Sequence, residues 1–210
     1  MSWSRHSKRE GYHHGNLRQA LIDAALAMIA ERGPGGFSLA ELAREIGVSP
    51  AAPYRHFRDR GALLAEIGRH GFELFEAELT GAWDGGKPEP VSAMIRCGRR
   101  YLGFARRQPA LYAVMFESGL DMQSDTALLR ASERAFGVLL SAAEHVCAAI
   151  RTPPRPPPMM VALHAWSMSH GIASLFLAHG TGSGRVLPMA PEDLLEAGML
   201  VYLGALGGKS

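Results

Sequence analysis

The chain has 210 residues, which is long enough for one or two domains with a substantial hydrophobic core. Apolar residues make up 47% and charged residues 20% of the sequence, as is normal for a soluble globular protein. The formal net charge of +2 is too small to indicate a nucleic-acid partner by itself. The first seventy residues nevertheless hold ten lysines and arginines against seven acidic residues, so the positive excess lies near the N-terminus.

The cysteine pattern and the longest apolar stretch argue against two further classes of protein. Cys97 and Cys147 are isolated, so neither a disulfide framework nor a cysteine-based metal site is expected. Residues 159–178 contain histidine and serine, as is typical of a buried helix rather than a membrane span. The basic N-terminus lacks the apolar run of a secretory signal. We therefore expect a cytoplasmic protein with no membrane partner, no metal and no cofactor.

The N-terminal part of the chain is predicted to be an arm followed by one helix. Residues 1–13 are interpreted as a flexible basic arm that could reach DNA, with terminal disorder as the alternative. The first helix, roughly 17–32, ends at Gly33 and has an apolar stripe along one face. The stripe consists of Leu17, Leu21, Ala25, Met28 and Ile29.

The segment 37–57 has the pattern of a helix-turn-helix. Ser38 and Glu41 form the S-x-x-E capping box that begins a helix, and an apolar face follows them. Gly47 stands where this helix must end, because glycine adopts a left-handed backbone without steric cost. A short second helix is therefore expected directly after this turn.

The second helix, roughly 50–57, has a surface suited to DNA. Ser49 is its predicted N-cap, and no acidic residue lies between Ser49 and Arg58. Small residues allow a close approach to base edges, and polar ones donate to phosphates or bases. The predicted DNA-binding residues are Ser38, Ser49, Ala51, Ala52, Pro53, Tyr54, Arg55, His56 and Arg60. The alternative is a small helical corner with a solvated basic edge.

Residues 37–64 resemble the DNA-binding segment of TetR-family transcriptional regulators. The matching features are Ser38, Leu42-Ala43, Gly47-Val48-Ser49, Tyr54-x-His56-Phe57, and Arg60 ahead of Leu63-Leu64. The resemblance covers about the first third of the chain and implies a helix-turn-helix domain over residues 14–72. Ala52-Pro53 departs from the threonine-leucine pair that is frequent in this family. Proline cannot donate an amide and crowds the preceding turn, so we expect the recognition helix to be tightened or bent.

The remainder of the chain, residues 73–210, is predicted to be all-α, with about nine helices in the whole protein. A long helix over 60–80 should link the DNA-binding unit to this part, because its second half must bury an apolar face elsewhere. After a loop at 81–90, helices are predicted over 90–107, 109–118, 124–150, 159–179 and 191–206. A proline-rich hinge at 152–158 and a glycine-rich loop at 180–188 separate the last three helices.

Methionine and aromatic residues in these helices are either ordinary core or the lining of a small-molecule pocket. The candidate ligand-binding residues are Arg100, Phe104, Tyr112, Met115, Phe116, Trp166 and His170, with His145 and His164 as further polar candidates. Trp166-x-x-x-His170-Gly171 is similar to a Trp…His-Gly signature in the C-terminal domain of one TetR subgroup. That resemblance implies an effector-binding and dimerisation domain and names no effector.

Helices 159–179 and 191–206 are the predicted dimer interface, because apolar residues cover most of their surface. In TetR-like proteins the corresponding helices form a four-helix interface. The alternative is that both helices are internal to one chain. A dimer would place its two recognition helices about one turn of DNA, roughly 34–36 Å, apart.

These features predict a homodimeric repressor that binds a palindromic operator on double-stranded DNA. We expect a small apolar or amphipathic effector to release it. The alternative is a ligand-independent architectural or interaction protein that binds DNA. The sequence lacks G-x-S-x-G, HExxH, P-loop and Rossmann patterns, which argues against an enzyme and gives no catalytic residues.

Overall fold

The computed structural model describes residues 14–123, 125–151, 155–176 and 189–207. The predicted basic arm at 1–13 and the glycine-rich loop at 180–188 lie outside these residues. Within the described residues the protein consists of α-helices and two short 3-10 turns, which confirms the all-α prediction. We refer to residues 14–72 as the head and to the described residues from 73 onward as the body.

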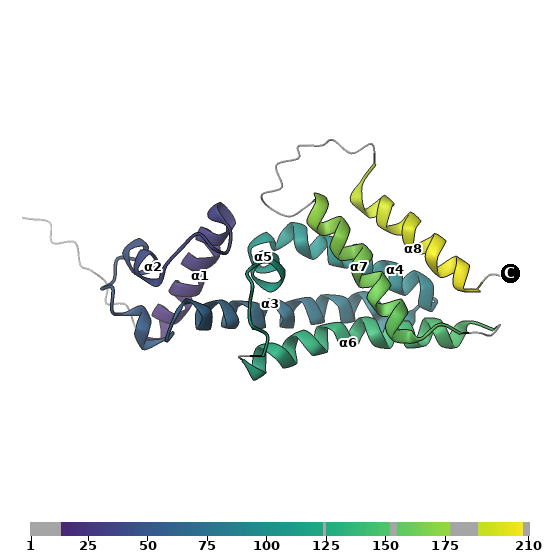
Figure 1. Ribbon diagram of the computed structural model, residues 1–210, viewed down its shortest axis with the longest axis horizontal. Coiled ribbons are helices and arrows are strands. Elements are labelled where there is room, and N and C mark those ends of the chain that lie inside the picture. The colour runs from purple at the N-terminus through teal and green to yellow at the C-terminus, as the bar shows by residue number, and fades with distance from the viewer. Residues whose placement is uncertain (1–13, 124, 152–154, 177–188, 208–210) are drawn as a thin grey trace, which may run out of the picture.

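Eight α-helices follow the predicted order (Figure 1). They are α1 (His14–Arg32), α2 (Leu39–Glu45), α3 (Arg60–Trp83), α4 (Pro90–Arg107), α5 (Pro109–Glu117), α6 (Thr126–Ala149), α7 (Pro158–Phe176) and α8 (Pro191–Gly207). The 3-10 turns are η1 (Pro53–Arg55) and η2 (Asp84–Gly86). Proline begins α4, α5, α7 and α8, as expected for a residue that has no amide hydrogen to lose.

The long helix α3 connects the head to the body (Figure 1). Asp59 caps its start by accepting a hydrogen bond from the Ala62 amide at 2.7 Å. Ile67 is buried in the head half of α3 and Phe75 in the body half, and both belong to one continuous hydrophobic core. Because α5 and α6 of the body pack on the same helix, a shift of α3 relative to α5 and α6 also shifts the head.

Two glycines of α3 allow α5 and the segment after it to pack closely against this helix. A Cβ at Gly68 would lie 2.7 Å from Leu120, and a Cβ at Gly71 would lie 2.7 Å from Met115. Both distances are shorter than side-chain packing permits. The absence of a side chain at Gly71 therefore allows α5 to lie directly against α3, and its absence at Gly68 makes room for Leu120 in the segment after α5.

The predicted loop at 81–90 was wrong over its first three residues, because α3 continues to Trp83. Ala82 and Trp83 are buried, and the Trp83 ring lies 5.5 Å from the His145 ring on α6. Burial of these side chains outweighs the turn-forming composition of the segment. The helix ends at Asp84, which adopts a left-handed backbone with φ of 44°.

Candidate nucleic-acid interface and effector pocket

The helix-turn-helix begins with the predicted capping box. The Ser38 side-chain oxygen accepts a hydrogen bond from the Glu41 amide at 3.2 Å, and Glu41 accepts one from the Ser38 amide at 2.8 Å. Glu41 also accepts a hydrogen bond from the Ser38 hydroxyl at 2.7 Å, and this bond, together with the one from the Ser38 amide, lowers the pKa of Glu41 below its ordinary value. The side chain of Ser38, a predicted DNA contact, is therefore engaged in fixing the start of α2.

The turn after α2 is also built as predicted. Gly47 adopts φ of +73°, and the Val48 amide donates to the Ala43 carbonyl at 2.9 Å. This closure is typical of a glycine-terminated helix. It directs the chain from the end of α2 towards the exposed segment that follows.

The predicted recognition helix over 50–57 was wrong in type. Only Pro53–Arg55 is helical, and this segment is a 3-10 turn. Ala52 occupies its N-cap position without a side-chain hydrogen bond, so Ser49 is not the cap of this element. Pro53 supplies no amide hydrogen and its ring opposes a regular α-helical turn, which accounts for the tightening.

The recognition turn, which we define as residues 49–56, exposes some of its predicted DNA contacts and buries another. The Tyr54 side chain is 57% exposed, and Ser49, Ala51 and Arg55 are also exposed. Ala52 and His56 are half-buried, and Pro53 is buried, so Pro53 does not present its ring to a thymine methyl. Arg55 is exposed and forms no ion pair with another described residue, so its charge is available to a phosphate.

Arg60 supports the recognition turn from inside the protein. Its guanidinium carbon lies 4.9 Å from the centre of the Phe37 ring, and its Nη2 donates to the Pro34 carbonyl. Its buried Nε has no acceptor among the described residues. The partly buried Arg60 therefore ties the start of α3 to the loop before α2.

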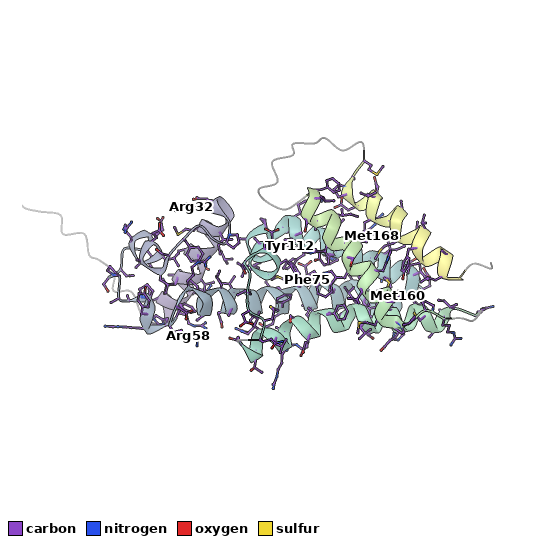
Figure 2. All side chains as sticks on the ribbon, in the orientation of Figure 1. Arg32, Arg58, Phe75, Tyr112, Met160 and Met168 are labelled. Carbon is purple, nitrogen blue, oxygen red and sulfur yellow. The ribbon has the colours of Figure 1, made fainter. Side chains whose placement is uncertain are left out.

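Two exposed arginines near the recognition turn were not among the predicted contacts. Arg44 lies on the last turn of α2, and Arg58 follows the recognition turn with Asp59 at 3.1 Å. Figure 2 shows Arg58 at the end of the molecule formed by the head. Both arginines could have been predicted from the sequence, because basic residues are concentrated on both sides of the turn. Together with Arg55 they place three exposed guanidinium groups near the recognition turn, where they can reach phosphates.

A polar cluster lies inside the body around His170 of α7. The hydroxyls of Tyr101 and Tyr112 lie 3.0 and 2.9 Å from His170 Nδ1, and the Ser174 hydroxyl lies 3.4 Å from Nε2. The Phe116 ring lies 5.3 Å from the imidazole. Figure 2 shows Tyr112 pointing into the interior of the body. The predicted residues Tyr112, Phe116 and His170 are thus brought together by α5 and α7.

A small cavity of about 10 Å³, roughly the size of one water molecule, adjoins this cluster. Six aromatic rings line it: Phe72, Phe75, Tyr101, Phe116, Phe136 and Trp166. Ser132, Ala135 and Leu139 complete the lining. No charged side chain is part of this lining, so the aromatic cavity, as we call it, suits an uncharged group.

The other predicted ligand contacts lie around the cavity rather than in its wall. Phe104 packs behind it, with its ring 5.1 Å from the Phe75 ring, and Met115 faces α3 at Gly71. Arg100 is exposed and lies 3.9 Å from Glu78, on a different side of α4. His164 is also exposed and stacks on Tyr202.

We expect the free energy of unfolding to fall between about pH 7.5 and about pH 5, where ordinary carboxyls remain ionised. Burial lowers the pKa of His170, and the charge of Glu117 raises it by less. The imidazole of the unfolded chain therefore binds a proton more readily than that of the folded protein. The free energy of unfolding declines as the pH falls below the pKa of His170 in the unfolded chain and towards its lower pKa in the folded protein. Urea titrations across this range should give a shallower pH slope for His170→Gln.

An exposed histidine provides the control for this measurement. His145 contacts the Ser141 carbonyl of its own helix at 2.8 Å, and a His145→Gln variant should keep the wild-type slope. An unchanged slope in His170→Gln would contradict the assignment of the pH dependence to the buried cluster.

The geometry defines the class of the protein. A capped helix and a glycine turn present an exposed aromatic and basic segment at one end, and a single long helix joins it to a helical body. This arrangement is that of a helix-turn-helix DNA-binding regulator. None of the described helices is long and apolar enough to cross a bilayer.

Two family descriptions match the chain. Residues 21–67 match "Bacterial regulatory proteins, tetR family", and residues 94–202, about half of the chain, match "Tetracyclin repressor-like, C-terminal domain". The chain belongs to the TetR family of DNA-binding transcriptional regulators, which is not a family of enzymes.

Individual relatives agree with this assignment. The HTH-type transcriptional regulator BetI of Rhizobium meliloti (strain 1021) is 32% identical over 101 residues, which are 47% of this chain and 50% of BetI. The chain spans between 27% and 59% of the length of four such curated relatives, BetI of Rhizobium meliloti included.

Solved structures share the fold over most of their length. A protein with unknown function from Rhodococcus sp. RHA1 has a TM-score of 0.76 and 28% identity, over 95% of this chain and 100% of that one. AibR in complex with isovaleryl coenzyme A and operator DNA has a TM-score of 0.64 and 18% identity, over 88% of this chain and 96% of AibR.

Proposed function

We propose that the chain is a homodimeric repressor that binds a palindromic operator and is released by a small apolar or amphipathic ligand. The observation that carries this proposal is the path from the exposed recognition turn through α3 to the aromatic cavity. Phe72 and Phe75 of α3 line that cavity, and the same helix carries the head. A ligand that displaces these rings would thus act on the position of the head. The alternative remains a ligand-independent architectural protein that binds DNA.

The dimer proposal rests on the outer faces of α7 and α8, which lie next to each other on the body (Figure 1). Large apolar side chains are exposed there: Met159, Met160, Leu163, Leu175, Leu194, Leu200 and Val201. The inner face of α8 is held to α4 by ion pairs of Arg99 with Glu196 and of Arg106 with Glu192. The apolar outer face is therefore left for a second copy of the chain.

Val201→Asp is expected to weaken dimerisation by at least about tenfold, because two-fold symmetry places an unpaired charge in the interface twice. Val201 is 76% exposed in the single chain, so the variant should fold normally. Sedimentation equilibrium gives the dimer dissociation constant, and circular dichroism checks the helix content. Leu74→Asp, at an exposed leucine of α3, is the control and should remain dimeric. A monomeric wild-type protein, or a Val201→Asp variant that dimerises normally, would contradict the proposal.

The aromatic cavity supports ligand sensing through its position and composition. Side chains almost fill this cavity, so a ligand must move them to enter. A filled core is also what the architectural alternative predicts. Phe136 of α6 and Trp166 of α7 are only partly buried, with rings 5.0 Å apart, and provide the entrance. AibR, which shares the fold, has been crystallised with both isovaleryl coenzyme A and operator DNA.

The ligand switch can be tested with DNA fragments selected by the purified protein. A release of about 100-fold needs a coupling free energy of about 2.7 kcal/mol, within the ordinary range. Fluorescence anisotropy of a labelled fragment should show weaker binding when apolar and amphipathic probes are added. Ser132→Leu, which places a larger side chain in the cavity wall, should bind DNA and lose the response. If no probe alters DNA affinity, the architectural alternative is favoured. A reporter gene behind the bound fragment distinguishes repression from activation.

A further inference from the structure

A second and larger cavity, of about 120 Å³, lies between α1, α3 and α5. It shares no lining residue with the aromatic cavity, so the two are separate places in the fold. Because α1 belongs to the head and α5 to the body, this cavity lies at the joint between them. We call it the joint cavity.

The floor of the joint cavity is apolar. It is formed by Ile22 and Leu26 of α1, Ile67 of α3 and Leu111 of α5. Ile67 and Leu111 are 1% and 5% exposed, so they belong to the fixed core, while the two α1 residues are partly buried. A short hydrocarbon chain would remove these surfaces from water.

The rim of the joint cavity is charged. Among the side chains that line it, the guanidinium groups of Arg18 and Arg69 share the single carboxylate of Glu66, at 3.0 and 2.8 Å. Arg69 is held further by Glu73 at 2.6 Å, which is outside the lining. Among the described residues Arg18 has this one ion pair, and its side chain is 47% exposed. Arg18 is therefore the cation that can turn towards a ligand at least cost.

We propose that the joint cavity binds a small monocarboxylate with a short apolar chain. The carboxylate accepts two parallel hydrogen bonds from the guanidinium of Arg18, and the chain lies on the apolar floor. A neutral alcohol of the same length gains only the apolar contacts with the floor and no ion pair with Arg18. On the outer side of Arg18, away from the paired Glu66 carboxylate, an alkylammonium ion of that length meets a guanidinium of like charge and is disfavoured.

The Glu66 carboxylate stays ionised beside the proposed ligand carboxylate. Burial raises the pKa of Glu66, but hydrogen bonds from Arg69 and Arg18 outweigh burial and bring its pKa below the ordinary value. It stays ionised at neutral pH and excludes a second carboxylate from its own side of the rim. This confines the ligand carboxylate to the outer side of Arg18.

A ligand bound in the joint cavity would affect the position of the recognition turn. The guanidinium carbon of Arg18 lies 5.4 Å from the centre of the Phe57 ring, which is buried directly after that turn. A ligand that holds Arg18 also touches α5, so it fixes the head at one angle to the body. This regulation is independent of the aromatic cavity and of the ligand proposed for it.

The binding test uses the full-length protein with sodium hexanoate, 1-hexanol and hexylamine as probes, measured by calorimetry. Hexanoate should bind about tenfold more tightly than 1-hexanol, and hexylamine should bind most weakly. Arg18→Gln should reduce hexanoate affinity to the level of 1-hexanol and leave 1-hexanol unchanged. Arg18→Lys keeps the charge without the bidentate geometry and should fall between them. Leu26→Trp, which fills the floor, should abolish binding of both.

Arg134→Gln is the matched control for Arg18→Gln. Arg134 also forms one ion pair, with Glu76 at 2.9 Å, and its side chain is 49% exposed, but it lies outside the joint cavity. This control should bind hexanoate like the wild type. Equal affinities for hexanoate and 1-hexanol, no binding of either, or an equal loss in Arg134→Gln would overturn the proposal. If Ser132→Leu abolishes hexanoate binding and Arg18→Gln does not, hexanoate binds in the aromatic cavity. The proposal of a site in the joint cavity is then wrong, while the proposed function stands.

Discussion

Replacing Tyr54 and Arg55 together by alanine should weaken binding to a selected duplex by about a hundredfold or more, because each lost DNA contact costs about 1–3 kcal/mol. Both side chains are exposed at the recognition turn, and neither contributes to the core. The free energy of unfolding should therefore change little. Arg60 is left unchanged in this variant because its guanidinium contacts Phe37 and the Pro34 carbonyl.

Fluorescence anisotropy at several salt concentrations measures this effect. Loss of the Arg55 charge should also make the dependence of affinity on salt less steep, since fewer counterions are released on binding. Arg130→Ala is the control, because Arg130 is exposed on α6 in the body, away from the recognition turn. Wild-type affinity in the double variant would show that DNA is bound by another surface.

Phe75→Ala is expected to lower the free energy of unfolding by about 3–5 kcal/mol, the range for removal of a buried phenylalanine ring. Phe75 is 4% exposed and lies inside the part of the body nearer the head (Figure 2). Its ring lies 5.0 Å from the Tyr101 ring and 5.1 Å from the Phe104 ring, in tilted and edge-on arrangements that stabilise aromatic pairs. The substitution removes these contacts of α3 with α4 and also the contact with the Phe116 ring of α5 at 6.3 Å.

Urea denaturation followed by circular dichroism measures this loss. The adjacent residue Leu74 is 37% exposed, so Leu74→Ala should change stability far less and serves as the control. A loss of less than about 1 kcal/mol for Phe75→Ala would mean that the aromatic cluster does not hold α3 to α4 and α5.

Much of the helical framework could be predicted from the sequence because its limits are set by local chemistry. Pro90, Pro109 and Pro191 each begin a helix where they were expected to. Ser38 and Gly47 likewise form the cap and the turn that their residue types favour. Such signals need only neighbouring residues in the chain, so tertiary contacts seldom override them.

The choice of residues around the aromatic cavity was harder, since adjacent positions on a helix point about 100° apart. The prediction selected Arg100, which is exposed, and omitted Tyr101, which is 1% exposed and contacts His170. A signal for Tyr101 was present, because it continues the buried stripe of Cys97 and Phe104 along α4. Whether that stripe meets a cavity or solid packing depends on α5, α6 and α7 and could not be read from α4 alone.

The recognition segment shows the opposite case, in which a single residue overrules a family pattern. The similarity to TetR regulators predicts a second helix, but Pro53 restricts the segment to one 3-10 turn. The size of this change could not be predicted, because proline is tolerated in the first turn of an ordinary α-helix.

The brevity of that turn limits how this protein can distinguish one base sequence from another. The element is only three residues long, so Tyr54, Arg55 and His56 point in different directions and have no helical neighbour three or four positions further on to extend any one face. Few of them can reach the edges of consecutive base pairs in the same groove. We expect an operator with a short conserved core in each half, whose remaining selectivity comes from how readily the flanking steps bend or narrow.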